Sequence, residues 1–253
     1  MLHTLCMFGA DLSRFLDLDG AEREALKRLT DDRVTFGRNT VVRAANTPVE
    51  SLYVIQNGWS ISSLKLGKRR QITNIGLPGD MVGLGEVAAS RTIHEIRTIT
   101  EVEVSRIGRD AFGTFVDRYP RLAVRILLLG ERRKRYHAEW LCALGRRTAR
   151  QRIALFLVTI QERLKPLGLA DDAFEMPMRQ QDIGDFTGLT SVSVSKTLGE
   201  LQLEKTIRCA YGEIRILDHE RLRNLADPLE DRLDIDTEWL HLQSQPVLRS
   251  EGA

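Results

Sequence analysis

The sequence is poor in the residues that build disulfide frameworks and metal centres. Its 253 residues include only three cysteines, Cys6, Cys142 and Cys209, which lie far apart along the chain. An odd number of scattered cysteines argues against disulfides and predicts reduced thiols in a cytoplasmic protein. No apolar run approaches the roughly 18 residues of a membrane span. The N-terminus also lacks a charged leader with a small-residue cleavage site, so neither export nor a membrane partner is expected.

The net charge of +2 conceals an uneven distribution. Residues 227–253 hold seven acidic and two basic residues, and the rest of the chain carries 35 basic against 28 acidic residues. Residues 121–163 alone contain eleven arginines and lysines and three glutamates. A basic middle is compatible with a polyanionic partner, although most such charges only solvate helix faces. The length suffices for two domains with their own cores.

Residues 179–198 have the pattern of two helices joined by a glycine turn. Apolar residues at helical spacing mark the two buried faces: Ile183, Phe186, Val194 and Leu198. Gly188 permits a left-handed turn between the helices, and Thr190 or Ser191 is suited to cap the second one. The pattern predicts a helix-turn-helix whose second helix lies in the DNA major groove. An ordinary helical hairpin in a core is the alternative.

Between residues 33 and 107 the apolar pattern changes to that of short strands. Glycine-punctuated, β-branched or aromatic runs occur at residues 34–36, 40–42, 51–55, 59–61, 71–75, 94–99 and 101–104. Such a series predicts a jelly-roll domain. Asn57-Gly58 is typical of a tight turn. Before this domain, Asp19 is expected to cap a short helix.

A long helix is predicted to begin at Pro120 and to break at Leu144-Gly145. Apolar positions at alternating four- and three-residue spacing form a seam: Leu122, Ile126, Leu129, Arg133, Tyr136 and Trp140. This seam predicts a parallel coiled-coil homodimer with one polar interruption. A second apolar face is expected to lie on the β domain: Val124, Leu127 and Leu128. The alternative is a wide amphipathic helix buried within one chain.

The remaining chain completes an α+β organisation. A further helix is expected around residues 153–160, a loop at 168–177, a β-wing turning near Tyr211-Gly212, and a closing helix around 220–226. The predicted parts are an N-terminal helical segment (1–32), a jelly-roll sensor domain (33–119), a dimerisation helix (120–145), a winged helix-turn-helix domain (146–226) and an acidic tail (227–253).

In this order, a jelly roll, a dimer helix and a winged helix-turn-helix resemble the family of the cyclic-AMP receptor protein and the fumarate–nitrate reduction regulator. The resemblance covers about residues 10–226 and is carried by residues 53–58, 70–71, 77–83, 144–153 and 181–190. It implies a bacterial transcription regulator that is not an enzyme. The implied partners are double-stranded DNA with a near-palindromic operator, a second copy of the chain, and RNA polymerase.

The resemblance also assigns roles within the helix-turn-helix. Five residues are expected to contact phosphates: Arg179, Gln180, Gln181, Thr190 and Ser193. Four are expected to face base edges: Ser191, Val192, Ser195 and Lys196. Val192 replaces the family's usual glutamate and Lys196 its usual arginine, so the half-site should differ from those of the best-known members.

The sensor domain departs from the cyclic-nucleotide pattern of the family. Leu84 stands where a glutamate usually follows Gly83, and residues 92–94 replace the arginine–serine pair that cups the phosphate. Cyclic AMP is therefore not expected. An effector pocket for an unidentified signal is assigned to Leu84, Gly85, Glu86, Thr92, Ile93 and His94.

The cysteines and histidines also bear on other cofactors and other classes of protein. Three scattered cysteines do not form the ligand set of an iron–sulfur cluster. A haem- or redox-sensing member, using His94 with Cys6 or an oxidisable Cys209, is an alternative that the sequence does not favour. A metal-dependent jelly-roll enzyme would need several histidines and a carboxylate, and His94 is the only histidine of residues 34–107. A pure ligand-binding or scaffold module leaves the winged domain unexplained.

Overall fold

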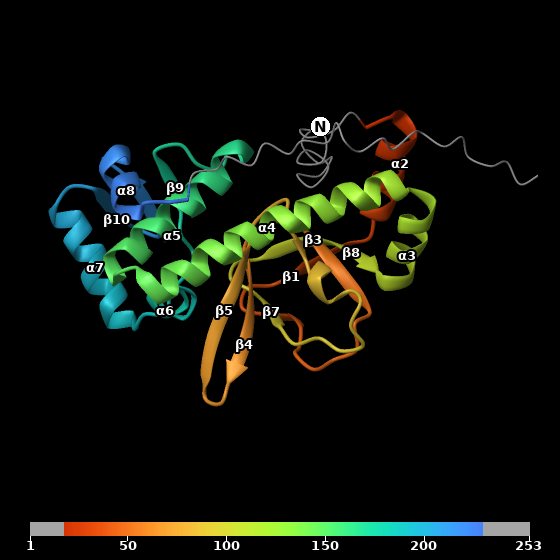
Figure 1. Cartoon of the computed structure of the whole chain (residues 1–253), viewed down its shortest axis with the longest axis horizontal. Coiled ribbons are helices and arrows are strands. Elements are labelled where there is room, and N and C mark those ends of the chain that lie inside the picture. Colours follow the sequence, from red (N-terminus) through yellow and green to blue (C-terminus); the bar gives the residue numbers. More distant parts are fainter. Residues whose placement is uncertain (1–17, 230–253) are drawn as a thin grey trace, which may run out of the picture.

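The computed structural model describes residues 18–229. The segment before residue 18, with Cys6, and the acidic tail from residue 230 lie outside the described residues. A sheet domain and a mainly helical C-terminal domain lie next to each other along one long helix, α4 (Pro120–Arg146) (Figure 1). At 1.5 Å per residue, this helix is about 40 Å long. None of the described helices combines the length and apolar composition needed to cross a bilayer.

Two four-stranded antiparallel sheets form the predicted jelly roll. The first has the order β1-β8-β3-β6 and the second the order β2-β7-β4-β5. The strands are β1 (Arg33–Phe36), β2 (Val41–Arg43), β3 (Ser51–Asn57), β4 (Ser60–Leu66), β5 (Arg69–Gly76), β6 (Met81–Val82), β7 (Glu95–Thr98) and β8 (Val102–Gly108). Ile55, Ile96 and Val104 fill the space between the sheets. The α+β fold class is thus confirmed, with β6 as a short strand that the sequence did not indicate.

Asn57-Gly58 forms a turn between strands of different sheets. The chain passes here from β3 in the first sheet to β4 in the second. Gly58 has a φ of +83°, and a Cβ there would lie 2.1 Å from the carbonyl oxygen of Glu101. Glycine is needed because the backbone crosses another segment closely at a left-handed residue.

Two short helices close the end of the sheet domain. In α2 (Gly20–Leu29), Asp19 accepts a hydrogen bond from the backbone N–H of Glu22 at 2.8 Å, and Glu22 accepts one from the N–H of Asp19 at 3.1 Å. This reciprocal capping box fixes the start of the helix, as the sequence predicts. α3 (Arg109–Arg118) follows the last strand and leads into α4.

The C-terminal domain is a winged helix-turn-helix. Its elements are α5 (Ala149–Leu164), η2 (Lys165–Leu167), β9 (Ala173–Glu175), α6 (Gln180–Thr187), α7 (Ser191–Leu203), β10 (Ile207–Ala210), β11 (Glu213–Ile216) and α8 (His219–Ala226). The wing turns at Tyr211 and Gly212, both with positive φ. Two expectations are corrected. β9 lies in the predicted loop and pairs with β11, and α4 continues through Gly145 until Thr148 caps α5.

Three of the six residues of the predicted dimer seam, Leu122, Ile126 and Trp140, are buried in the chain's own core, which corrects their assignment to a dimer interface. Leu122 and Ile126 are buried against α2, α3 and the first sheet. Trp140 is 5% exposed and contacts Phe186 edge-on, with the ring centroids 4.5 Å apart. Tyr136 packs beside it, half-buried. Leu122, Ile126 and Trp140 are therefore buried within one chain, as in the alternative of an amphipathic helix packed on its own core.

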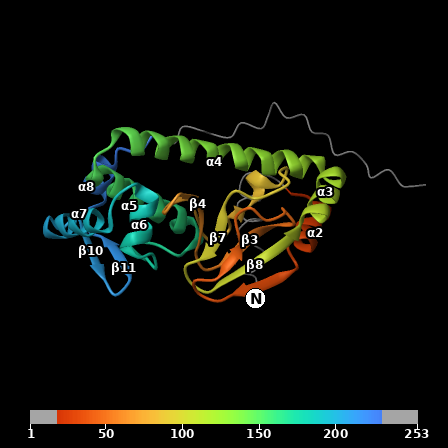
Figure 2. The same cartoon turned by 90° about the horizontal axis from the view of Figure 1, so that it is seen from below.

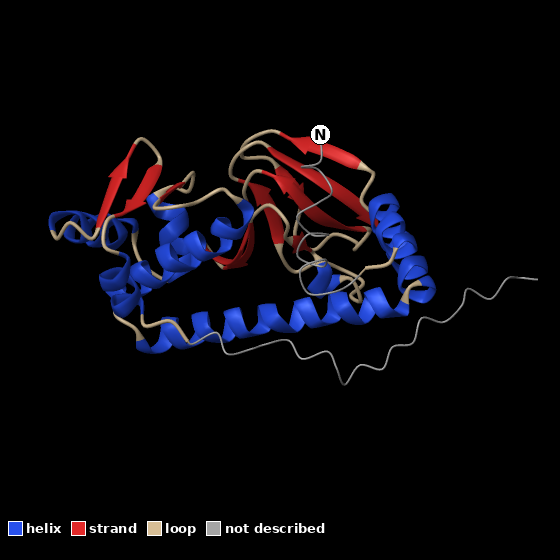
Figure 3. Ribbon diagram, turned by 90° about the horizontal axis from the view of Figure 1, so that it is seen from above, coloured by secondary structure: helices blue, strands red, loops and turns tan. Residues whose placement is uncertain are grey.

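Of the second face expected on the β domain, Val124 and Leu128 are half-buried, whereas Leu127 is 59% exposed. Leu141, two heptads after Leu127, is 73% exposed. Figures 2 and 3 show both domains on one side of α4, so no described element covers the opposite side of the helix. The side chains of Leu129 and Arg133 lie outside the description, and their place on the predicted seam stays a prediction.

Candidate DNA-binding surface and sensor pocket

The turn between α6 and α7 is fixed by glycine geometry and a hydroxyl cap. Gly188 has a φ of +68°, and its N–H donates to the carbonyl of Gly184. A Cβ on Gly184 would lie 2.5 Å from the carbonyl oxygen of Leu189, so the turn packs directly on α6. Thr190, rather than Ser191, caps α7: its hydroxyl accepts the N–H of Ser193 at 3.1 Å. The rigid turn sets the direction of α7 relative to α6.

The predicted apolar faces hold the two helices together. Ile183 and Phe186 on α6 and Val194 and Leu198 on α7 are all buried in one core. That core continues into the sheet domain through Trp59, Ile72, Ile75 and Leu77. The helix-turn-helix is therefore packed against the sensor domain of its own chain.

The outward side of α7, together with one residue of α6, forms a shallow and open surface, which we call the groove. Its lining consists of Gln180, Ser191, Val192, Ser195 and Lys196. All four residues predicted to face base edges are thus brought together with one predicted phosphate contact. Val192 is 75% exposed although it is apolar. An amide, two hydroxyls, an isopropyl group and an ammonium group provide the hydrogen-bonding and apolar contacts that base edges require.

The other predicted phosphate contacts surround this groove, and several have partners within the chain. The Thr190 and Ser193 hydroxyls share a hydrogen bond of 2.9 Å. The Gln181 amide donates to Asp185 at 2.8 Å. Arg179, at the start of α6, is exposed, and its backbone N–H donates to Asp182 at 3.2 Å. Gln180 lines the groove, the other four lie at the start of α6 or α7, and the contact of all five with DNA stays a prediction.

Contacts between the sensor domain and the helix-turn-helix were not predicted from the sequence. Arg70 on β5 donates to Asp182 at 2.5 Å and pairs with Asp185 at 2.7 Å, both on α6. Gln71 donates to the carbonyl of Phe186 at 3.3 Å. Arg163 on α5 pairs with Asp80 of the turn after β5. Arg70 and Asp182 are 112 residues apart, so no local pattern connects them.

In the sensor domain, the predicted pocket residues surround a buried carboxylate. The short helix η1 (Leu84–Glu86) presents Glu86, whose Oε1 accepts the backbone N–H groups of Ile93 at 2.8 Å and His94 at 3.0 Å. His94 Nδ1 lies 2.8 Å from the same oxygen, and Arg43 pairs with Oε2. Burial alone would raise the pKa of Glu86, but these hydrogen bonds and the charge of Arg43 lower it below its usual value.

The remaining pocket residues do not open onto this carboxylate. The Leu84 side chain packs on the core beneath α4, and the Thr92 hydroxyl donates to the carbonyl of Ala44 at 2.9 Å. Gly85 and the Ile93 side chain are exposed, the latter by 62%. Ile93 and His94 thus contact Glu86, whereas Leu84 and Thr92 contact other parts of the domain, and the role of the six residues as an effector pocket stays a prediction.

Candidate metal and redox residues were also located. Within residues 18–229 no group of three or more histidine, cysteine or acidic side chains has the arrangement of a metal site. Cys209 is half-buried on β10, and burial raises the pKa of its thiol. A raised pKa disfavours the reactive thiolate that an oxidation switch uses.

A jelly-roll domain, a long connecting helix and a winged helix-turn-helix define the class of DNA-binding transcription regulators. The cyclic nucleotide-binding domain family matches residues 33–119, and the Crp-like helix-turn-helix domain family matches residues 151–225. The nitrogen fixation regulation protein FixK of Bradyrhizobium diazoefficiens is 33% identical over 210 residues, which cover 83% of this chain and 87% of that protein. The transcriptional activatory protein AadR of Rhodopseudomonas palustris is 31% identical over 211 residues, with coverage of 83% and 87%.

A solved structure supports the same assignment. FixK2 from Bradyrhizobium japonicum superimposes with a TM-score of 0.70 at 26% identity, covering 76% of this chain and 96% of that one. The chain belongs to the CRP/FNR family of transcription regulators.

The match to the cyclic nucleotide-binding domain family allows a test of whether the residues fit such a ligand. A cyclic phosphate is an anion that needs backbone N–H groups and a cationic donor. Here the N–H groups of Ile93 and His94 already donate to Glu86, and Arg43 pairs with the same carboxylate. The residues present do not fit a cyclic nucleotide.

Proposed function

We propose that this transcription regulator is a cytoplasmic homodimer that reads a near-palindromic operator through the N-terminal half of α7. The observation that carries the proposal is the groove lined by Gln180, Ser191, Val192, Ser195 and Lys196. Its α7 residues lie opposite the buried Val194 and Leu198, so the helix is held by one side and free on the other. Such an arrangement supports insertion of α7 into a major groove.

Each groove residue has a contact suited to its chemistry. Lys196 reaches guanine O6 or N7 as a single point donor, Val192 contacts a thymine methyl, and the serine hydroxyls bond to either kind of base. Gln180 and Arg179, at the exposed start of α6, contact phosphates and set the register of the protein on DNA. Lys196 lies 3.9 Å from Glu200, a distance at which an exposed pair holds it only weakly.

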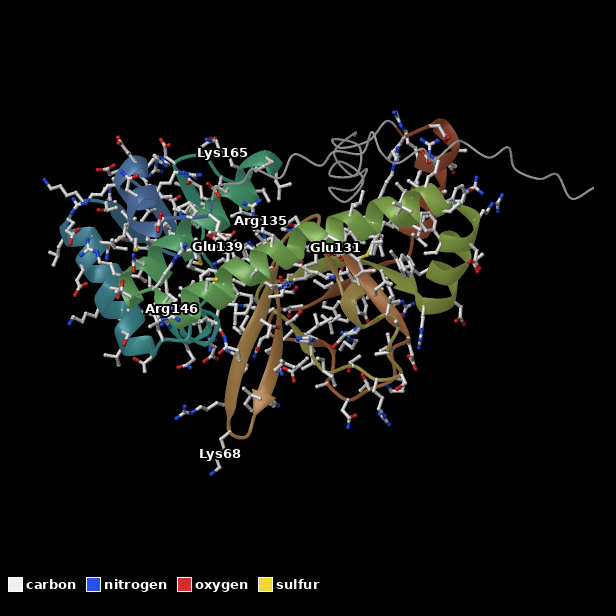
Figure 4. The ribbon with its side chains drawn as sticks, viewed as in Figure 1. Lys68, Glu131, Arg135, Glu139, Arg146 and Lys165 are labelled. Carbon is white, nitrogen blue, oxygen red and sulfur yellow. The ribbon has the colours of Figure 1, made fainter. Side chains whose placement is uncertain are left out.

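The dimer is proposed to form through the open face of α4. Leu127 and Leu141 lie two heptads apart on that face, with Lys134 midway between them. Figure 4 labels Glu131 on this helix, where it pairs with Lys134 at 2.6 Å within the same chain. Two α4 helices in parallel would place two α7 helices beside each other, on half-sites about 10 base pairs apart. RNA polymerase is the further partner that this role requires.

The signal acting on the sensor domain is proposed to be something other than a cyclic nucleotide. The hydrogen-bonded Glu86 carboxylate supports this, because it uses the donors that a cyclic phosphate would need.

Equilibrium titration of a labelled operator duplex tests the proposed reading helix. Lys196→Ala should lower affinity for the operator by about 1–3 kcal/mol and relax the base preference at one position of each half-site. The control is Lys205→Ala, since Lys205 is an exposed lysine just beyond the other end of α7. Equal effects of the two substitutions, or none from Lys196→Ala, would show that α7 does not read bases through this groove.

A further inference from the structure

The β4–β5 hairpin carries an unusual concentration of positive charge at its end. The hairpin tip, defined as Lys65, Lys68 and Arg69, consists of three exposed cations within five residues around a left-handed glycine, Gly67. Across the two strands Lys65 lies opposite Arg70, so like charges face each other. Asp182 and Asp185 pair with Arg70 and so weaken this repulsion. The three clustered cations of the tip form a surface that favours an anionic partner.

Among the described residues, no acidic side chain forms an ion pair with the hairpin tip. Arg70, the next residue along β5, is different, because it pairs with both Asp182 and Asp185 on α6. Arg70 thus binds the helix-turn-helix, whereas Lys65, Lys68 and Arg69 are exposed to solvent. Figure 1 shows the hairpin projecting from the body away from α4, and Figure 4 shows Lys68 extended at its end.

Arg70 also connects the hairpin to the part of α6 that borders the groove. Its guanidinium donates to Asp182 Oδ1, while Oδ2 of the same carboxylate accepts the backbone N–H of Arg179. Gln180, the next residue, lines the groove. Arg70 therefore offsets part of the negative charge that Asp182 and Asp185 place near Arg179. At about 3.3 Å per residue, the tip reaches roughly 7–10 Å beyond Arg70.

We infer that the hairpin tip is a second DNA-contacting element, which binds phosphates flanking the half-site read by α7. This inference rests on the proposed function and extends it to the sensor domain. Duplex DNA carries one negative charge per roughly 1.7 Å of axis, so a duplex longer than the half-site presents phosphates to a tip at this distance. The contact needs no sequence preference, because lysine and arginine bind phosphate as charges. Because Arg70 and Gln71 join the hairpin to α6, the tip and α7 would engage one duplex as a rigid pair.

Salt-dependent titrations with two duplexes test the inference. One duplex ends at the outer edges of the selected half-sites, and the other continues by roughly one helical turn on each side. The test variant is Lys65→Gln/Lys68→Gln/Arg69→Gln. The control is Lys27→Gln/Arg109→Gln/Arg118→Gln, which removes the same charge from exposed cations of α2 and α3 at the opposite end of α4. Circular dichroism establishes that both variants are folded.

On the long duplex the test variant should lose about tenfold or more in affinity at low salt, with a log–log salt slope smaller by about 0.9 per lost phosphate contact. On the short duplex the affinity and salt slope of the test variant should equal those of the wild-type protein. The control variant should have wild-type affinity and salt slope on both duplexes. An unchanged slope on the long duplex overturns the inference. So does a defect confined to transcription with RNA polymerase while DNA binding is unchanged, because the tip would then contact a protein. If the wild-type protein showed no sequence preference, the proposed function would be overturned instead. The salt slopes of the test variant and the wild type on non-specific DNA would then still show whether the hairpin tip contacts phosphates.

Discussion

Trp140 and Leu141 are consecutive residues of α4, but the first is buried and the second is exposed. Replacing each one by alanine distinguishes the role of the buried face in folding from the role of the exposed face in the proposed dimer. Trp140 is 5% exposed and packs on Phe186, whereas Leu141 is 73% exposed. A buried tryptophan hides about 150–250 Å², which at about 25 cal/mol per Å² corresponds to roughly 4–6 kcal/mol as an upper bound. Trp140→Ala should therefore lower the free energy of unfolding by about 4 kcal/mol. Leu141→Ala should change the folding stability of the single chain by less than about 0.5 kcal/mol.

Urea denaturation followed by circular dichroism, at two protein concentrations, distinguishes the two effects. The loss in Trp140→Ala should be the same at both concentrations, because the contact lies within one chain. Leu141→Ala should instead shift the monomer–dimer equilibrium measured by sedimentation, and its apparent stability should depend on concentration. If Trp140→Ala dissociated the dimer and left the unfolding free energy of the chain unchanged, the assignment of the two faces would be wrong.

Two further substitutions probe the sensor domain and the turn. Glu86→Gln should lower stability at neutral pH by about 1–3 kcal/mol, because it weakens the bonds from Arg43, Ile93 and His94. Since the pKa of Glu86 is lowered in the folded state, its stabilisation is present above the usual carboxyl pKa and is lost as the pH falls through the lowered one. The difference in melting temperature between variant and wild type should thus shrink in acid, and a constant difference would contradict the assigned role. Gly188→Ala should cost about 1–2 kcal/mol from its left-handed φ alone, and its Cβ would lie 2.9 Å from Leu144 Cδ2; an unchanged thermal midpoint would show that the turn tolerates a side chain.

Features set by a few neighbouring residues were predictable from the sequence. Asp19 caps α2, Gly188 takes the left-handed conformation, and Tyr211-Gly212 turns the wing, as predicted. Each depends on a backbone conformation or a hydrogen bond within about four residues, which residue type alone largely determines. The groove residues were predictable for a related reason. Because Val194 is buried, the helical repeat places Val192, Ser195 and Lys196 on the opposite, outward side of the same short helix.

Features set by distant residues were not predictable in the same way. The spacing of Leu122 and Ile126 fits both a coiled coil and a helix packed on its own sheet domain, because both bury one stripe of the helix. Only the position of α2, α3 and the first sheet decides between them. The ion pairs of Arg70 with α6 join segments more than a hundred residues apart. The strand β9 is three residues long, too short for its periodicity to be recognised before β11 is placed beside it.

The most direct test of the account is selection of DNA from a random pool by the wild-type protein and by Val192→Glu, followed by sequencing of the bound fraction. Wild type should enrich a near-palindrome whose half-sites are about 10 base pairs apart. Val192→Glu should enrich the same spacing, with a single symmetric position in each half-site changed toward cytosine, because a carboxylate accepts from the cytosine amino group. An identical consensus from both proteins, or a change at scattered positions, would contradict the claim that this end of α7 reads the operator.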